Sequence, residues 1–363
     1  MKNFIFVPKI ETKISNAFRV ITGNKNANNP NHMKQILLLT LLFTSGFQCF
    51  AQDENFQASG RPFAVIFANF HQGLTNSSSD ESAFELVRGY IGYEYTFTPE
   101  FYAKVNLDIG SPEDLSEYAK SRRYAYFKNA FLRYTHDQLK VEFGLIGLKQ
   151  YKLMEKTWGR RYLMKTFADE YSIGSSADLG MNINYTFSKI WDIDFTIMNG
   201  EGYNNIQSDG IFKYAVGSTI KPVKNLCTRL YFDFTKDEEA QTTYHFFASY
   251  NFNGKANIAG ETLYRLNDDC EKDHNRYGFS IYGHYQIEKR YQLFARFDKI
   301  YSNKLDGESN PWNLSDDGSA LIAGIQFQPI NQIKFALNYH DWVPYASNAD
   351  TKSFIYLNLE VKL

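Results

Sequence analysis

Residues 353–363, SFIYLNLEVKL, alternate between apolar and polar side chains. Ile355, Leu357 and Leu359 fall on one face of an extended strand, and Asn358 and Glu360 fall on the other, because successive side chains of a strand point to opposite faces. A strand with one apolar and one polar face suits a membrane barrel, in which the apolar face meets lipid and the polar face meets a water-filled interior. This stretch therefore predicts a transmembrane β-strand.

The same period-two pattern recurs upstream through the rest of the chain. Most of the segments approach the roughly 9 to 11 residues that a tilted strand needs to cross a bilayer. Together with the last one, they predict sixteen strands at 61–71, 84–97, 101–109, 122–136, 139–149, 177–187, 190–199, 211–221, 225–235, 241–252, 255–266, 276–286, 289–300, 319–328, 331–341 and 353–363.

The connections between these segments alternate in length. Tight turns such as Asp137-Gln138 and Asn253-Gly254 follow the even segments, and long polar loops follow almost every odd segment, the exception being 236–240. An even number of strands with alternating short turns and long loops is the plan of an outer-membrane barrel. We predict an all-β, closed, antiparallel barrel of sixteen strands, with its turns in the periplasm and its loops outside.

Composition agrees with an aromatic β protein. The 363 residues include 17% aromatic side chains and only 9 prolines. No apolar run after Phe47 approaches the roughly 20 residues of a membrane-spanning helix. Cys227 and Cys270 lie far apart in the sequence and form no CxxC motif, so neither a disulfide framework nor a zinc site of that type is expected.

The first fifty residues have the organisation of an export signal. Met33 and Lys34 precede the apolar run 36–43, ILLLTLLF, and Ala51 stands before the expected cleavage point. We therefore expect a signal peptide at 33–51, an upstream extension at 1–32 and a barrel domain at 52–363. Loss of residues 1–51 removes six basic residues and one acidic residue, which leaves a net charge of about −6 and argues against nucleic-acid binding.

The longest interval without alternation is 151–176, YKLMEKTWGRRYLMKTFADEYSIGSS. We expect it to fold into the barrel lumen; an ordinary surface loop is the alternative. Its basic residues are the candidates for a pore constriction: Lys152, Lys156, Arg160, Arg161 and Lys165. Asp169 and Glu170 are candidates for holding it to wall arginines such as Arg229 or Arg296.

Charged residues with inward phase are expected to line the wall. The main candidates are Arg229, Arg265, Arg296, Glu261 and Asp298. A ring of charge at a narrow point acts strongly on passing ions, because a low-dielectric wall focuses its field. The phase of the fourth segment is left open, since Lys128 and Arg133 fall on opposite faces of it.

WGRRYLMKTFADEYSIGSSADLG at 158–180 and MNGEGY at 198–203 resemble the phosphate-selective porins of the O and P type that are widespread in Bacteroidetes. The resemblance implies an outer-membrane channel with an anion preference and an external loop that narrows the pore. The chain ends in Leu363, where many such barrels end in an aromatic residue.

The predicted function is passive diffusion of small hydrophilic or anionic solutes, among them phosphate, through the outer membrane. Lipid and lipopolysaccharide would surround the barrel, a homotrimer is one expected assembly, and no cofactor is expected. The alternatives are a non-channel barrel, such as an adhesin or envelope anchor, and a barrel hydrolase. We name no catalytic or metal-binding residue, because the histidines are scattered and lie in no HExxH or GxSxG motif.

Overall fold

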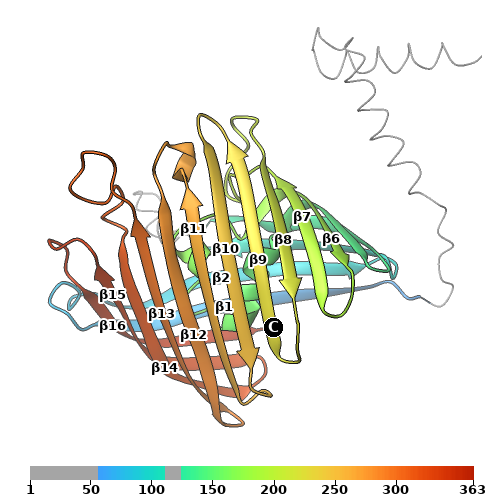
Figure 1. Ribbon diagram of the computed structural model, residues 1–363. Coiled ribbons are helices and arrows are strands. Elements are labelled where there is room, and N and C mark those ends of the chain that lie inside the picture. Colours follow the sequence, from blue (N-terminus) through green and yellow to red (C-terminus); the bar gives the residue numbers. More distant parts are fainter. Residues whose placement is uncertain (1–55, 111–123) are drawn as a thin grey trace, which may run out of the picture. The chain divides into compact units, whose positions relative to one another are not determined.

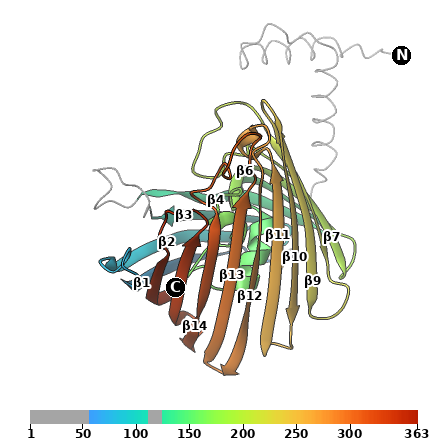
Figure 2. The same ribbon diagram turned by 60° about the vertical axis from the view of Figure 1, so that its left-hand side comes forward.

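The computed structural model describes residues 56–110 and 124–363, which form a closed antiparallel barrel. Each strand pairs with its neighbours in the sequence, and β1 (Ser59–Gly73) pairs with β16 (Lys352–Lys362) to close the ring. Figures 1 and 2 show the tilted strands from two directions. Closure leaves no unpaired strand edge. The predicted barrel of sixteen antiparallel strands is confirmed.

The other strands are β2 Ser82–Thr96, β3 Phe101–Ile109, β4 Ala125–His136, β5 Leu139–Gly147, β6 Ala177–Thr186, β7 Trp191–Met198, β8 Lys213–Ile220, β9 Leu226–Lys236, β10 Ala240–Asn251, β11 Ala256–Leu266, β12 Arg276–Glu288, β13 Tyr291–Ser302, β14 Gly318–Ile330 and β15 Ile333–Pro344. The helical elements are α3 Lys149–Trp158, α4 Phe167–Glu170 and the 3₁₀ turn η1 Asp268–Cys270. The expected bounds differ from these by a few residues at some strand ends, where hydrogen-bonded pairing, not alternation, sets the limit.

Two kinds of connection separate the ends of the barrel. Short turns join β2 to β3, β4 to β5 and each later even strand to the next odd one. Asp137, Asn253 and Gly254 adopt positive φ angles of 48°, 53° and 79°, which tight hairpin turns require. We call this end of the barrel the short-turn end and the opposite one the long-loop end. The backbone of Leu363 pairs with that of Ala64 at the short-turn end.

The faces of the strands follow the predicted alternation. On β16, Leu357 is 49% exposed, whereas its neighbour Asn358 is 3% exposed. On β6, Leu179 and Tyr185 are exposed, while Asn182 is buried. Apolar side chains are thus exposed outside and polar ones are buried inside, the arrangement that a barrel in lipid requires.

A β-bulge explains why the phase of β4 was ambiguous. Asn106 of β3 pairs with Asn129, but the next residue, Leu107, pairs with Phe127, so Lys128 is an extra residue in the ladder. A bulge shifts the alternation by one residue. Lys128 and Arg133 therefore face the same side despite their opposite parity in the sequence.

The expected signal peptide, residues 33–51, and the upstream extension, 1–32, lie outside the described residues. Among the helices that the structure describes, none has the length and apolar character needed to cross a bilayer.

Candidate functional site

The segment between β5 and β6, residues 148–176, is the longest described connection, and we call it the central segment. Its helix α3 ends at Gly159, whose φ of 67° places it in the left-handed region and whose N–H donates to the Glu155 carbonyl at 2.8 Å. Glycine accommodates such a helix end without strain. The chain then turns and forms the short helix α4 before β6 begins.

Aromatic packing attaches the central segment to the barrel wall. Trp158 is 1% exposed and packs edge-on against Tyr282 of β12 and Phe294 of β13, with ring centroids 5.5 and 6.2 Å apart. Its indole N–H donates to the Met164 carbonyl at 3.1 Å. Tyr162 donates to the Gln326 side chain of β14 at 2.9 Å. One apolar cluster thus joins this segment to several strands.

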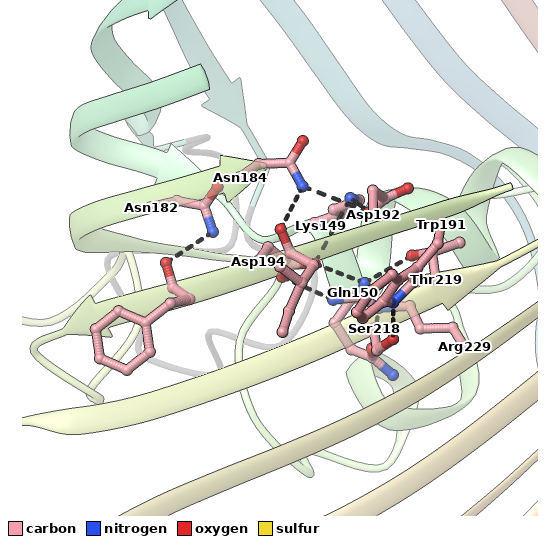
Figure 3. A network of polar contacts seen from close by, with 12 residues as sticks. Lys149, Gln150, Asn182, Asn184, Trp191, Asp192, Asp194, Ser218, Thr219 and Arg229 are labelled. Carbon is pink, nitrogen blue, oxygen red and sulfur yellow. Dashed lines mark hydrogen bonds and ion pairs between the residues drawn. The ribbon is translucent and has the colours of Figure 1, made fainter. Parts of the chain in front are cut away.

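A polar network holds the start of α3 to strands β7 and β9 (Figure 3). Arg229 of β9 binds Asp194 of β7 through two bonds of 2.7 and 2.9 Å and donates to the Gln150 side-chain oxygen at 2.8 Å. Lys149 forms ion pairs with Asp192 and Asp194. A forked guanidinium–carboxylate pair is a strong and directional contact, so it fixes the position of Gln150.

Gln150 also orders a histidine on the next strand. Its amide lies 2.7 Å from His245 Nδ1, and His245 Nε2 lies 2.9 Å from Glu261. Since the Gln150 oxygen accepts from Arg229, its NH₂ group donates to Nδ1, and the histidine proton therefore lies on Nε2 and points at Glu261. Both ring nitrogens are occupied.

Arg160, the first of the two candidate arginines at the constriction, is 2% exposed. Its guanidinium donates to the Trp158 carbonyl at 3.1 Å and to Gln292 at 2.7 Å, and it lies 4.7 Å from the centre of the Phe294 ring. Burial lowers the pKa of Arg160 to about 10. Aromatic packing of the segment therefore covers the guanidinium of Arg160, which the sequence predicts at the pore constriction.

Arg161, the second candidate, is paired within the central segment. It contacts Asp169 at 2.8 Å and Glu155 at 3.4 Å. Burial opposes ionisation of Asp169, but Arg161, Lys128 and Lys165 together outweigh it, and the pKa of this carboxyl is lowered. Asp169 therefore binds its own segment, and not the expected wall arginines. Glu170 likewise accepts from the Lys165 backbone N–H at 3.2 Å, and burial raises its pKa.

The candidate lysines are placed differently from the arginines. Lys152 and Lys156 are exposed, and no carboxylate of the described residues lies within 4 Å of either ammonium group. The side chain of Lys165 lines a cavity, while its carbonyl accepts from Arg296 of β13.

The expected wall residues are all buried and mostly paired. Arg296 binds Asp298 at 2.6 Å, and Arg265 binds Asp268 at 2.9 Å. Asp268 belongs to η1, three residues after its partner Arg265, and was not among the predicted wall residues. It lies beyond the alternating segment 255–266, so the period-two pattern did not mark it as inward-facing. Within residues 56–110 and 124–363, no group of three or more His, Cys, Asp or Glu is arranged to hold a metal ion.

Two cavities adjoin the central segment. The first, of about 690 Å³, is bounded by loop residues 199–205 and by the ends of β8 and β11, at the long-loop end. The second, of about 580 Å³, opens toward the short-turn end. The described lining of the first has four basic and five acidic side chains, and that of the second has two acidic side chains, Glu155 and Glu360, and seven basic ones: Lys104, Lys128, Lys152, Lys156, Arg161, Lys334 and Lys362.

Comparisons with known proteins support the fold. No family model and no curated protein matches the sequence. Among solved structures, the chain is similar to Salmonella typhi OmpF in complex with daunomycin, with a TM-score of 0.63, 10% identity and coverage of 84% of this chain and 97% of that one. It is also similar to the outer-membrane channel DcaP of Acinetobacter baumannii, with a TM-score of 0.63, 11% identity and coverage of 87% and 100%.

A third similar structure is the anion-selective porin of Comamonas acidovorans, with a TM-score of 0.61, 11% identity and coverage of 85% and 100%. At this level of identity, the similarity establishes the architecture alone. The structural neighbours of this sixteen-strand barrel are outer-membrane porins and channels.

Proposed function

We propose that this protein is an outer-membrane porin through which small hydrophilic solutes diffuse, with a mild preference for anions. The observation that carries the proposal is the attachment of the central segment to strands around the ring, from Tyr90 of β2 and Arg229 of β9 to Gln326 of β14, with a cavity on each side. A segment bound to so many strands of a closed barrel narrows the interior without filling it.

The polar side chains inside the barrel support a water-filled channel. The buried side of the wall carries ion pairs such as Arg229–Asp194 and Arg296–Asp298. Such a polar interior suits water and ions, and exposed apolar side chains suit lipid outside. An adhesin or envelope anchor needs neither a polar interior nor two cavities.

Anion preference is proposed from the charges near the central segment. The cavity at the short-turn end has seven basic side chains against two acidic ones. At physiological salt, charges more than about 8 Å away are largely screened, so these side chains act on a passing ion more strongly than the net negative chain does. The phosphate preference and the relationship to the O and P type porins rest on the resemblance of 158–180 and 198–203.

The proposal includes export by residues 33–51, maturation at Gln52, and placement of the short-turn end in the periplasm. A homotrimer in a lipid and lipopolysaccharide membrane is its expected assembly, which cross-linking in native membranes would test. A hydrolase is less favoured, because the hydrogen-bond partners of His245 are Gln150 and Glu261, and neither supplies a nucleophilic hydroxyl or thiol.

Planar-bilayer recording of the purified protein tests this function. We expect discrete conductance steps and, in a potassium chloride gradient, a reversal potential of the sign given by excess chloride permeation. Folded protein that inserts into the bilayer without conducting would overturn the porin proposal. Conduction with a preference for potassium would overturn only the anion preference.

A further inference from the structure

We infer that Lys128, on the bulge of β4, determines the charge selectivity of the channel at its narrow region. The inference rests on the proposed porin function and names the residue that would give it selectivity. Lys128 is 9% exposed and lines the cavity at the short-turn end. The bulge places both Lys128 and Asn129 on the buried side of the wall, although they are consecutive residues.

Lys128 lies at the boundary between the two cavities. The cavities share no lining residue, but contacts join the lining of one to that of the other. Lys128 Nζ, in the second cavity, lies 3.8 Å from the centre of the Tyr203 ring, in the first. The Arg161–Asp169 ion pair, of 2.8 Å, crosses the same boundary. We place the path of a solute between the two cavities beside these groups.

The cations near this boundary differ in how they are compensated. Arg161 is paired with Asp169, and Arg88 contacts Asp108 at 3.4 Å. Lys128 donates to the Ser176 hydroxyl at 2.5 Å, and no carboxylate of the described residues lies within 4 Å of it. A charge with an adjacent carboxylate has a short-ranged field, whereas the ammonium group of Lys128, when protonated, is offset only by Asp169 and Asp108, which lie beyond 4 Å.

Two further donors lie in the same part of the cavity. The amide nitrogen of Asn129 is buried and has no hydrogen-bond partner among the described residues. A Cβ atom at Gly147 would lie 2.9 Å from Lys152 Nζ and 3.3 Å from this Asn129 nitrogen, so the two groups are close neighbours. An anion beside Lys128 could thus meet additional N–H donors.

The size of the effect follows from Coulomb's law. One unit charge that acts in water on an ion about 8 Å away favours the anion and disfavours the cation, and together these effects change the permeability ratio about fivefold. Removing the charge at Lys128 should therefore reduce the chloride-to-potassium ratio by about that factor at low salt, and by less at high salt.

The test is the reversal potential of full-length channels in a potassium chloride gradient. We expect Lys128→Gln to lower the chloride-to-potassium permeability ratio about fivefold and Lys128→Arg to retain the wild-type ratio. Lys362→Gln is the matched control: it removes the same charge from the same cavity, but at a side chain that is 48% exposed at the short-turn end and lies 3.2 Å from Glu360. The chloride-to-potassium permeability ratio of Lys362→Gln should change much less than that of Lys128→Gln.

Each outcome bears on a separate statement. If wild-type channels do not conduct, the proposed function fails. If they conduct and Lys128→Gln keeps the wild-type ratio, or changes it no more than Lys362→Gln does, the assignment of Lys128 is overturned. Lys128→Met, which keeps the aliphatic stem over Tyr203, replaces the glutamine variant if the latter does not give the folded band on an unboiled gel.

Discussion

Replacing Trp158 by alanine should detach the central segment and enlarge the channel. The indole is 1% exposed, meets Tyr282 and Phe294 edge-on, and donates to Met164. Truncating a buried tryptophan costs about 3–5 kcal/mol. Because each 1.4 kcal/mol is a factor of about ten, the detached state should become roughly 10² to 4 × 10³ times more populated.

The assay is single-channel conductance in a planar bilayer, together with migration of unboiled and boiled samples on a gel. We expect Trp158→Ala to give larger or noisier steps while the barrel still forms, since backbone pairing between strands does not involve the indole. Trp158→Phe keeps an apolar ring but loses the Nε1 bond, worth about 0.5–1.5 kcal/mol, and part of the packing of the larger indole, so its effect should be smaller than that of alanine.

Trp312→Ala is the control for loss of a tryptophan as such. Trp312 lies in the loop 303–317, donates to the Asn275 carbonyl at 3.1 Å and packs against His274, neither of which belongs to the central segment. The single-channel conductance of the Trp312→Ala variant should match that of the wild type. Unchanged conductance in a folded Trp158→Ala channel would refute the view that this segment narrows the pore.

Three other predictions concern the Arg161–Asp169 ion pair, the space for a side chain at Gly217 and cleavage of the signal peptide. The pKa of Asp169 is lowered in the folded protein, so the Arg161–Asp169 pair contributes stability above the ordinary pKa of 3.8 and loses it as the pH falls through the lower folded value. The difference in stability between Asp169→Asn and wild type should therefore be full at pH 7 and vanish in strong acid; a difference that vanishes already at pH 6 would contradict this pairing. Gly217→Ala should lower the temperature at which the folded gel band disappears, because its Cβ would lie 2.8 Å from Arg229 Nη1, whereas the control Gly260→Ala meets nothing closer than 3.6 Å. N-terminal sequencing of the outer-membrane protein should give Gln52, and a start before Lys34 would refute the expected signal.

Local pattern was sufficient to predict the barrel. Strand identity depends on period-two alternation, as in 353–363, and strand order depends on short turns such as Asn253-Gly254, which bring neighbouring segments together. Alternation and turn residues are both local features of the sequence, since each is read from a few consecutive residues. The number of strands and most of their inward faces could therefore be predicted. The inward placement of wall charges such as Arg229 and Arg296 followed from the same phase.

The partners of the central segment depended on the tertiary structure. Nothing in the sequence indicates that Asp169 binds Arg161, that Arg160 packs on Phe294, or that Gln150 reaches Arg229 and His245, because these contacts depend on how one segment packs against many strands. The inward placement of Lys128 was also hidden, since a single bulge residue reverses the phase of its strand. Alternation reports which face a residue takes relative to its neighbours, whereas ion pairing is decided by the distances that barrel closure imposes.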